Sequence, residues 1–227
     1  MGGNKISIII PHADRYNNLF TALESLSKLN TKPATVVVSD FSHSIERAEG
    51  IKNFNGKLNI KFVHSNRGIF VRGRAINFGR KFITTPLMLI YDTDLTVKPN
   101  ALDKLLKAFG DPPKNLLAGF KGIMQKKNGG SVPNTATFDR VYGAFMAMRT
   151  TSFDEVGGHN PYMKGWGWQD VDLRDRLIKH GRCKEVVLNE KYLHIWHPPS
   201  VNHKTDSKNR EIASKSFWNG TKWLFTR

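Results

Sequence analysis

The stretch PLMLIYDTDL, residues 86–95, decides how the rest of the chain is interpreted. Its first part, Pro86 to Tyr91, has the apolar composition of a buried strand, and Asp92 and Asp94 follow it directly. Side chains at alternate positions of an extended segment point to the same side, so the two carboxylates can share a ligand. Two interpretations are open from these residues alone. Either the acids cap a turn or helix, which is the commoner use, or they bind a hard divalent cation.

Further apolar runs on the N-terminal side of this stretch indicate strands of the same kind at residues 5–10, 35–38 and 58–63. Between them, apolar residues recur at helical spacing over residues 19–29, and a second helical pattern covers residues 72–82. Strands that alternate with helices predict an α/β fold with a mostly parallel, Rossmann-like central sheet flanked by helices.

Polar residues follow these predicted strands. Pro11 and His12 come after the first, Asp40 comes after the second, and residues 92–94 come after the fourth. The ligands of open parallel sheets bind beyond the carboxyl ends of the strands. We therefore expect these residues to gather at one edge of the sheet, although they are far apart in the sequence.

The chain changes character beyond residue 110, where Gly, Pro and Asn cluster at residues 111–113 and 128–130. Residues 140–148 predict another strand, and residues 169–180 predict a helix that is closed by Gly181. The sequence contains no repeat, no low-complexity tract and no clear linker. We therefore expect a single domain over residues 1–227.

The composition points to an anionic partner without identifying it. Lys and Arg number 35 against 19 Asp and Glu, which gives a net charge of +16. Such an excess suits nucleic acid, anionic lipid, nucleotide phosphates or an acidic polymer. No nucleic-acid recognition motif is present, so we expect no specific nucleic-acid partner. Cys183 is the only cysteine, so the chain forms no internal disulfide, as in proteins of a reducing compartment.

Targeting signals are also missing from the sequence. No apolar run approaches the roughly 20 residues that span a bilayer, and the first residues do not have the pattern of a signal peptide. These features predict a cytoplasmic protein. Near the C-terminus, Trp218, Trp223 and Phe225 lie among Lys and Arg residues. This segment either packs on the domain as a helix or lies on the inner face of the membrane.

Two histidines and a tryptophan-rich segment supply further candidates for chemistry. Imidazoles combined with carboxylates suit manganese or zinc. His194 and His197 point to opposite faces if their segment is extended, and they converge if it turns. Both arrangements are open.

The segment GWGWQDVDL, residues 165–173, combines glycine hinges with tryptophan rings, which offer flat faces to sugars. Asp170 and Asp172 fall in the first turn of the predicted helix, where the helix dipole favours negative charge. Both can cap the helix, which is the interpretation we prefer for Asp172. For Asp170, beside Trp168, we favour a general base acting on a hydroxyl group.

Taken in order, these motifs resemble a known family. The order is a strand ending in Pro11, a strand ending in Asp40, a helix carrying Arg72, the D-x-D motif, the segment 165–173 and finally H-x-x-H. Over residues 5–200 it resembles the nucleotide-sugar-dependent glycosyltransferases of the GT-A fold. It resembles in particular the family 2 bacterial enzymes and the galactosyltransferase module of beta-1,4-galactosyltransferases and chondroitin synthases. The resemblance implies a nucleotide-binding half (1–110), an acceptor-binding half (111–200) and a basic aromatic tail (201–227).

The resemblance also assigns roles to residues. It implies contacts with the donor nucleotide for Pro11, His12, Arg15, Asp40, Phe70, Arg72, Asp92 and Thr93. It implies contacts with the sugar or acceptor for Trp166, Gly167, Trp168 and Gln169. It implies metal ligation by Asp94, His194 and His197. It makes Asp170 the catalytic base.

The activity implied by the resemblance is inverting, metal-dependent transfer. A hexose or N-acetylhexosamine would move from a UDP-sugar to a hydroxyl of a glycan or lipid-linked acceptor, with Mn²⁺ or Mg²⁺ as cofactor. An acidic acceptor or a membrane surface would use part of the positive charge. The family usually has Glu where this chain has Gln169, and Met where it has His194. The alternative is a catalytically silent module of the same fold that binds a glycan or nucleotide.

Overall fold

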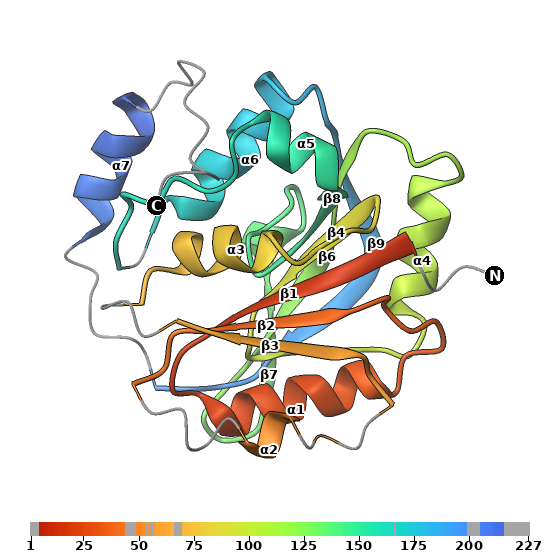
Figure 1. Ribbon diagram of the computed structural model, residues 1–227. Coiled ribbons are helices and arrows are strands. Elements are labelled where there is room, and N and C mark those ends of the chain that lie inside the picture. Colours follow the sequence, from red (N-terminus) through yellow and green to blue (C-terminus); the bar gives the residue numbers. More distant parts are fainter. Residues whose placement is uncertain are drawn as a thin grey trace.

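The computed structural model describes residues 5–43, 49–52, 54, 57–65, 70–165, 167–198 and 205–215. A nine-stranded sheet runs through these residues, and helices cover both of its faces (Figure 1). The strand order is β3-β2-β1-β4-β8-β6-β9-β5, and β7 pairs with β6 off this path. The α/β class and the helix-flanked sheet predicted from the sequence are confirmed.

The elements alternate along the first half of the chain and become more irregular in the second half. The strands are β1 (Ile6–His12), β2 (Val36–Asp40), β3 (Ile60–His64), β4 (Leu87–Tyr91), β5 (Leu95–Val97), β6 (Leu116–Gln125), β7 (Ser131–Asn134), β8 (Phe145–Arg149) and β9 (Lys184–His194). The helices are α1 (Tyr16–Ser27), α2 (Glu49–Lys52), α3 (Arg72–Arg80), α4 (Ala101–Phe109), the 3-10 turn η3 (Thr135–Thr137), α5 (Thr150–Glu155), α6 (Gln169–Lys179) and α7 (Asp206–Lys215).

Strands β3, β2, β1 and β4 form a parallel half-sheet, as the alternation of strands and helices predicts. In this half Ile8 lies opposite Val36 on one side and opposite Leu89 on the other. At the carboxyl edge Asp40 lies opposite His64. Every residue of β1, β2 and β4 is buried. Near-continuous runs of Val, Ile and Leu are typical of parallel strands that are covered on both faces.

Side chains that alternate along these strands build two cores, one on each face of the sheet. Ile8 belongs to the core beneath α1 and α4, whereas Ile9 belongs to the core with α3, α5 and α6. Figure 1 shows α1 and α3 on opposite faces accordingly. On α3, a Cβ at Gly79 would lie 2.9 Å from Cγ2 of Ile9, so a glycine is needed for the helix to approach β1 this closely.

Strand β8 joins the two halves and is antiparallel to both β4 and β6. The sequence predicted a strand over residues 140–148, but the strand covers only Phe145–Arg149, so the first part of that prediction is wrong. The chain turns before β8, and the N–H of Phe145 donates to the carbonyl oxygen of Tyr142 at 3.1 Å. This turn carries Gly143 to the carboxyl edge of the parallel strands, where its carbonyl accepts a hydrogen bond from Arg72.

Strand β9 was not predicted from the sequence, although it is central to the second half. It pairs in parallel with β6 and antiparallel with β5. Its sequence KEVVLNEKYLH mixes charged and apolar residues, and only Glu190 and Tyr192 are buried. Glu190 is buried because Lys104 forms an ion pair with it from α4 and Lys98 lies 3.7 Å away. A strand of this composition has no clear alternation for sequence reasoning to detect.

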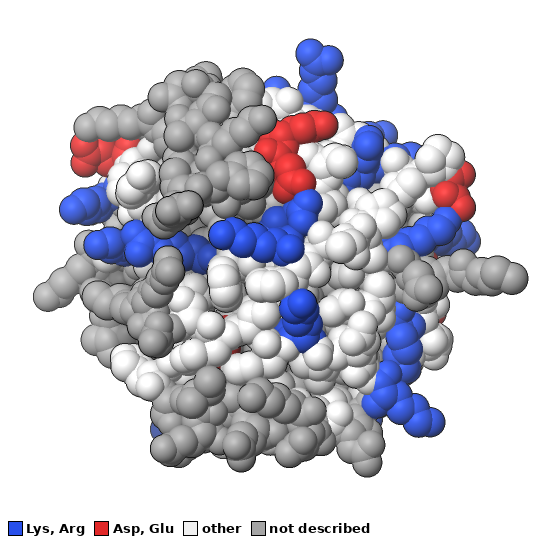
Figure 2. Space-filling model, in the orientation of Figure 1, with Lys and Arg blue, Asp and Glu red and all other residues white. Residues whose placement is uncertain are grey.

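On the face of the molecule that Figure 2 shows, the basic side chains do not form one patch. Figure 2 shows Lys and Arg side chains scattered across the visible face, with few acidic side chains among them. Within the part of the chain that the structure describes, no helix is long and apolar enough to cross a membrane. Trp218, Trp223 and Phe225 lie outside the described residues, so the membrane contact of the tail stays a prediction.

Phe145 tests the packing between the two halves. Its ring is 1% exposed and stacks on Phe120 at a centroid distance of 4.4 Å, with Tyr91 and Tyr192 each at 5.9 Å. We expect Phe145→Ala to lower the free energy of unfolding by about 4 kcal/mol, because truncation removes buried contacts and leaves a cavity. Urea denaturation measures this loss. The control Val132→Ala, at a 38% exposed position, should change stability by less than about 0.5 kcal/mol. A similar loss for both variants would contradict the packing argument.

Candidate active site

The residues predicted to gather at the carboxyl edge do so. His12 ends β1, Asp40 ends β2, and Asp92 directly follows β4. Arg15, in the loop after β1, donates from Nη1 to Oδ2 of Asp94 at 2.8 Å, across 79 positions of sequence. Because parallel strands bring their carboxyl ends together, residues that follow different strands become neighbours here.

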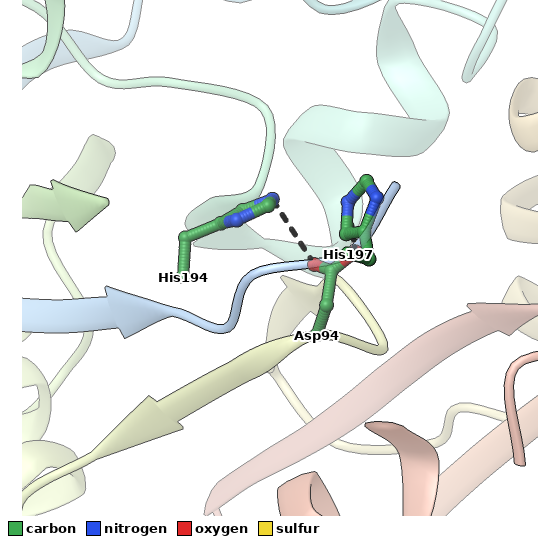
Figure 3. Close-up of side chains that lie close together, drawn as sticks. All are labelled: Asp94, His194 and His197. Carbon is green, nitrogen blue, oxygen red and sulfur yellow. Dashed lines mark ion pairs between the residues drawn. The ribbon is translucent and has the colours of Figure 1, made fainter. Parts of the chain in front are cut away.

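Asp94, His194 and His197 form a cluster suited to a divalent cation. His194 Nε2 lies 3.4 Å from Oδ1 of Asp94, and His197 Nε2 lies 3.2 Å from Oδ2. One ligand atom from each residue lies within 4.8 Å of the others. Figure 3 shows the two imidazoles on either side of the Asp94 carboxylate. One carboxylate with two imidazoles is a donor set that fits Mn²⁺ or Zn²⁺.

Backbone pairing explains how the cluster forms. Leu95 of β5 lies opposite His194 of β9, and the N–H of Ile195 donates to the carbonyl of Asp94 at 2.7 Å. Strand β9 ends at His194, so the following residues leave the extended path and His197 turns back toward Asp94. The open question about the two histidines is therefore answered, because the segment turns and their side chains converge.

The Asp94 carboxylate is ready to accept a cation. The side chain is 6% exposed, and its buried Oδ1 accepts no hydrogen bond from any described residue. Burial raises the pKa of Asp94, but the hydrogen bond from His197 and the surrounding positive charges outweigh burial and hold the pKa below its ordinary value. The same hydrogen bond raises the pKa of His197. A buried carboxylate oxygen that lacks a donor is the observation that supports a metal ligand here.

Asp92 has a different partner from Asp94, although only one residue separates them. Arg72, at the start of α3, donates from Nε and Nη2 to Oδ1 of Asp92 at 2.9 and 2.7 Å. Arg15 and Arg72 are both predicted to bind the donor, and each pairs with one acid of the D-x-D motif. In this structure the two acids therefore have different arginine partners.

Asp170 lies at the second position of α6 and contacts Gly143. The N–H of Gly143 lies 3.4 Å from Oδ2 of Asp170, and a Cβ on Gly143 would come within 2.3 Å of the Asp170 Cβ. Arg72 Nη2 also donates to the carbonyl of Gly143 at 2.7 Å. Gly143 therefore connects the predicted base to the arginine that binds Asp92. The sequence motifs do not predict the contacts of Gly143 with Asp170 and Arg72, which only the structure shows.

Gln169 contacts the backbone that leads into α6. Its side chain is buried, and Nε2 donates to the carbonyls of Met163 and Gly165 at 3.1 and 2.9 Å. Trp168 caps α6 in the left-handed conformation, with φ of 63°, and Arg210 lies 5.3 Å from its ring centroid. The sugar and acceptor roles of Gln169, Gly167 and Trp168 stay predictions, and Trp166 lies outside the described residues.

Asp40 is the centre of a buried polar cluster at the ends of β1, β2 and β3. His12 Nδ1 and Ser42 Oγ lie 2.6 and 2.5 Å from its Oδ1, and His64 Nδ1 lies 2.7 Å from its Oδ2. Asp40 and His12 are fully buried. Burial raises the pKa of Asp40, but its three side-chain hydrogen bonds outweigh burial and hold the pKa below its ordinary value. In this structure Asp40 is thus occupied by protein groups, and its contact with a nucleotide stays a prediction.

The other predicted donor residues line the same region less directly. Pro11 lies within β1 opposite Ser39. Thr93 is buried, and its Oγ1 has no hydrogen-bond partner among the described residues. The ring of Phe70 packs against Phe41 at 6.4 Å.

Two family models match the chain. The model described as Glycosyl transferase family 2 matches residues 7–163, well over half of the chain. The model described as N-terminal domain of galactosyltransferase matches residues 135–198. Between them the two matches include β1, the D-x-D motif, Asp170 and both histidines.

Known proteins show the same likeness. The chain is 26% identical over 251 residues to chondroitin sulfate synthase 3 of Homo sapiens, which covers 94% of this chain and 27% of that protein. It is 24% identical over 219 residues to beta-1,4-galactosyltransferase 4 of Rattus norvegicus, which covers 93% of this chain and 54% of that protein. The chain thus spans about a quarter and about half of the length of these two relatives.

A solved structure confirms the GT-A fold. The structure described as GalNAc-T7 with UDP, GalNAc and Mn²⁺ aligns with a TM-score of 0.70 at 18% sequence identity. The alignment covers 94% of this chain and 49% of that one. The resemblance stated from the sequence motifs is therefore confirmed at the level of family and fold.

The Asp40 cluster predicts a pH-dependent contribution to stability. We expect Asp40→Asn to lower the free energy of unfolding at pH 7 by about 3 kcal/mol, because buried imidazoles lose their ionised partner. The folded-state pKa of Asp40 lies below its unfolded value of about 3.9, so the contribution is complete above that pH and is lost as the pH falls through the folded-state pKa. Urea titrations of wild type and Asp40→Asn measure the free energy of unfolding. The full difference in this free energy should be present at pH 5, and it should become smaller below about pH 4.

The matched control is Asp14→Asn. Asp14 is half exposed and pairs with His43 at 2.8 Å on the surface, so its loss should cost less than about 1 kcal/mol. Equal losses for Asp40→Asn and Asp14→Asn would show that the buried cluster contributes no more than a surface pair.

Proposed function

This chain belongs to glycosyl transferase family 2, and we propose that it is an inverting glycosyltransferase that uses a UDP-sugar as donor. A hexose or N-acetylhexosamine would move to a hydroxyl group of a glycan or lipid-linked acceptor. One observation carries the proposal: Asp94 of the D-x-D motif belongs to a cluster suited to a cation, and Asp92 of the same motif is joined by a short series of contacts to a carboxylate suited to act as base. The series runs from Asp92 through Arg72 and Gly143 to Asp170.

Asp94, His194 and His197 are the residues that would hold a divalent cation. When bound, Mn²⁺ or Mg²⁺ supplies positive charge that stabilises the diphosphate of the leaving group. Oδ1 of Asp94, which accepts no hydrogen bond from any described residue, and the two converging imidazoles support this assignment. Mn²⁺ is preferred over Mg²⁺, since imidazole ligands suit the softer ion better.

Asp170 is proposed as the general base. It would accept the proton of the acceptor hydroxyl while that oxygen forms a bond to the anomeric carbon. The bond from the anomeric carbon to the diphosphate oxygen breaks at the same time, and its electron pair leaves with UDP. A single displacement from the opposite face inverts the anomeric configuration. The N-terminal end of α6 favours the negative charge that Asp170 needs before the reaction.

Arg15 and Arg72 would help to bind the donor. Each guanidinium now pairs with an acid of the D-x-D motif, at 2.8 Å for Arg15 and 2.7 Å for Arg72. Phosphate oxygens are good partners for guanidinium groups, which can donate two parallel hydrogen bonds. GalNAc-T7, which shares the fold, was solved with UDP, and this supports a uridine diphosphate as the nucleotide part of the donor.

The acceptor is proposed from charge alone. With a net charge of +16, the surface carries far more cations than one nucleotide diphosphate requires. An acidic glycan or a lipid-linked sugar at an anionic membrane would use the remaining charge.

The first experiment measures UDP release from a panel of UDP-sugars, each with a panel of acceptors, in Mn²⁺ or in chelator. We expect release with one or two donors, dependent on the metal. Asp94→Ala should abolish the UDP release that depends on the metal. It should also weaken Mn²⁺ binding, measured by calorimetry, at least tenfold. Asp170→Asn should lower kcat about 10³-fold, the usual contribution of a general base, while UDP binding remains.

The control on the same helix is Asp175→Asn, since Asp175 pairs with Arg174 and its side chain is 44% exposed. It should leave kcat unchanged. Normal transfer by Asp170→Asn would overturn the assignment of the base. Metal-dependent UDP binding without transfer by the wild type would support the silent binding module instead.

Gly143 supplies a second test of the same geometry. We expect Gly143→Ala to lower kcat between about 10-fold and 100-fold, because the added Cβ displaces Asp170 and misplaced catalytic groups lose rate steeply. The same UDP-release assay measures the effect. Gly130→Ala is the control, since a Cβ there meets its nearest atom at 3.4 Å in an exposed turn. Unchanged kcat in Gly143→Ala would mean that Asp170 does not act from this position.

A further inference from the structure

The segment that leads into α6, of which the structure describes Met163–Gly165 and Gly167, is held by two primary amides, one from α6 and one from α7. Gln169 of α6 donates to the carbonyls of Met163 and Gly165. Asn209 of α7 donates from Nδ2 to the carbonyls of Lys164 and Gly167, at 2.8 and 3.0 Å. Both side chains are buried, with Asn209 only 1% exposed. Four carbonyls of one short segment thus depend on two side chains, and we refer to this arrangement as the amide clamp.

The backbone of the segment shows how closely α7 lies against it. Gly165 and Gly167 have φ values of 66° and 96°, in the region that favours glycine. A Cβ on Gly165 would lie 2.6 Å from Oγ1 of Thr205, and one on Gly167 would lie 2.2 Å from Oδ1 of Asp206. Trp168 follows with φ of 63°, which is uncommon for a residue with a side chain. A backbone bent in this way persists only when its surroundings hold it.

An amide suits the positions of Gln169 and Asn209, whereas a carboxylate does not. A primary amide carries two hydrogens and can donate to two carbonyls at once, whereas an ionised carboxylate donates none. Glu or Asp at these positions would place a buried negative charge against two carbonyl oxygens and remove the side-chain hydrogen bonds that these oxygens accept. This explains in physical terms why Gln169 replaces the Glu that the sequence motif led us to expect.

The amide clamp lies directly before the proposed base. The N–H of Gln169 donates to the carbonyl of Gly167, and the N–H of Asp172 donates to that of Trp168, so the segment sets where α6 begins. Asp170 is the next residue along the helix, and its Cβ already lies as close to Gly143 as a glycine allows. A shift at the start of α6 therefore changes the position of the Asp170 carboxylate.

We propose that Gln169 and Asn209 are positioning residues that, through the segment Met163–Gly167, hold Asp170 where it can act. This inference rests on the proposed function for the role of Asp170, whereas the amide clamp itself can be tested without any activity. On this inference α7 contributes to the site through Asn209, although α7 begins 36 residues after Asp170. The inference also changes the predicted role of Gln169 from sugar contact to backbone support.

The experiment compares Gln169→Glu and Asn209→Asp with wild type in the full chain. Each change keeps the shape of the side chain and removes both donors. Hydrogen exchange measured by mass spectrometry should be at least about tenfold faster over residues 163–170 in both variants, because the carbonyls that anchor the bend lose their partners. In the UDP-release assay, kcat should fall between about 10-fold and 100-fold, while the KM for the donor stays within about threefold.

Asn115→Asp is the matched control. Asn115 also donates from one amide to two carbonyls, those of Gly181 and Arg182 at 2.8 and 3.2 Å, but at the far end of α6. This variant should lower the melting temperature without changing exchange at residues 163–170 or kcat. Should the charged variants fail to fold, Asn209→Ala removes the donors without adding charge, and the same two measurements apply to it.

The outcomes separate this inference from the proposed function. If the folded variants exchange hydrogen at residues 163–170 at the same rate as wild type, the amide clamp is overturned, whatever their activity. Faster exchange with an unchanged kcat would overturn the positioning role and leave the clamp as a structural feature only. A wild type without activity on any donor would overturn the proposed function, and exchange would still decide about the clamp.

Discussion

The antiparallel pairing of β5 with β9 is the interaction on which the site depends. Asp94 lies just before β5 and His194 ends β9, so the register that sets Leu95 opposite His194 brings together residues that are far apart in the sequence. Asp92 and Asp94 follow β4 at the edge of the parallel half-sheet, whereas His194 and His197 come from the end of β9 and the residues after it. The second half of the chain therefore supplies the ligands, and the first half supplies the edge that receives them.

Electrostatics at this edge follow one rule: each buried carboxylate has a basic partner. Asp40 has His12 and His64, Asp92 has Arg72, and Asp94 has two histidines and Arg15. Burying an unpaired carboxylate would cost several kcal/mol, so these pairs stabilise the free protein. The ion pairs of Asp92 and Asp94 can also be replaced by other partners. A diphosphate can accept hydrogen bonds from the arginines, and a cation can bind the carboxylates. On the proposed function, donor and metal binding would then replace existing charge pairs rather than create new buried charges.

Sequence reasoning succeeded where a pattern follows directly from local physics. The strands β1, β2 and β4 are mostly apolar and buried throughout, and the acids at or after their ends had to meet because parallel strands share a carboxyl edge. Prediction from the sequence failed where tertiary contacts determine the local structure or the role of a residue. β9 mixes charged and apolar residues and is held by partners on both sides, so no period marks it. The turn before β8 was read as strand because its residues are compatible with one. The convergence of His194 and His197 depends on where β9 ends, and the role of Gly143 depends on contacts with Arg72 and Asp170.

Gln169 shows how a departure from a motif can be misjudged when the surrounding backbone is unknown. Judged by sequence, Gln in place of Glu removes a negative charge beside the proposed base, and this supported a silent binding module. In the structure the side chain donates two hydrogen bonds to the backbone of the preceding segment. A carboxylate could not donate those two hydrogen bonds, so the backbone of the segment gives a physical reason for an amide at this position. A contact between Gln169 and a sugar stays a prediction. The burial of Asn209 on the other side of the same segment indicates that the chain maintains this bend with two separate elements.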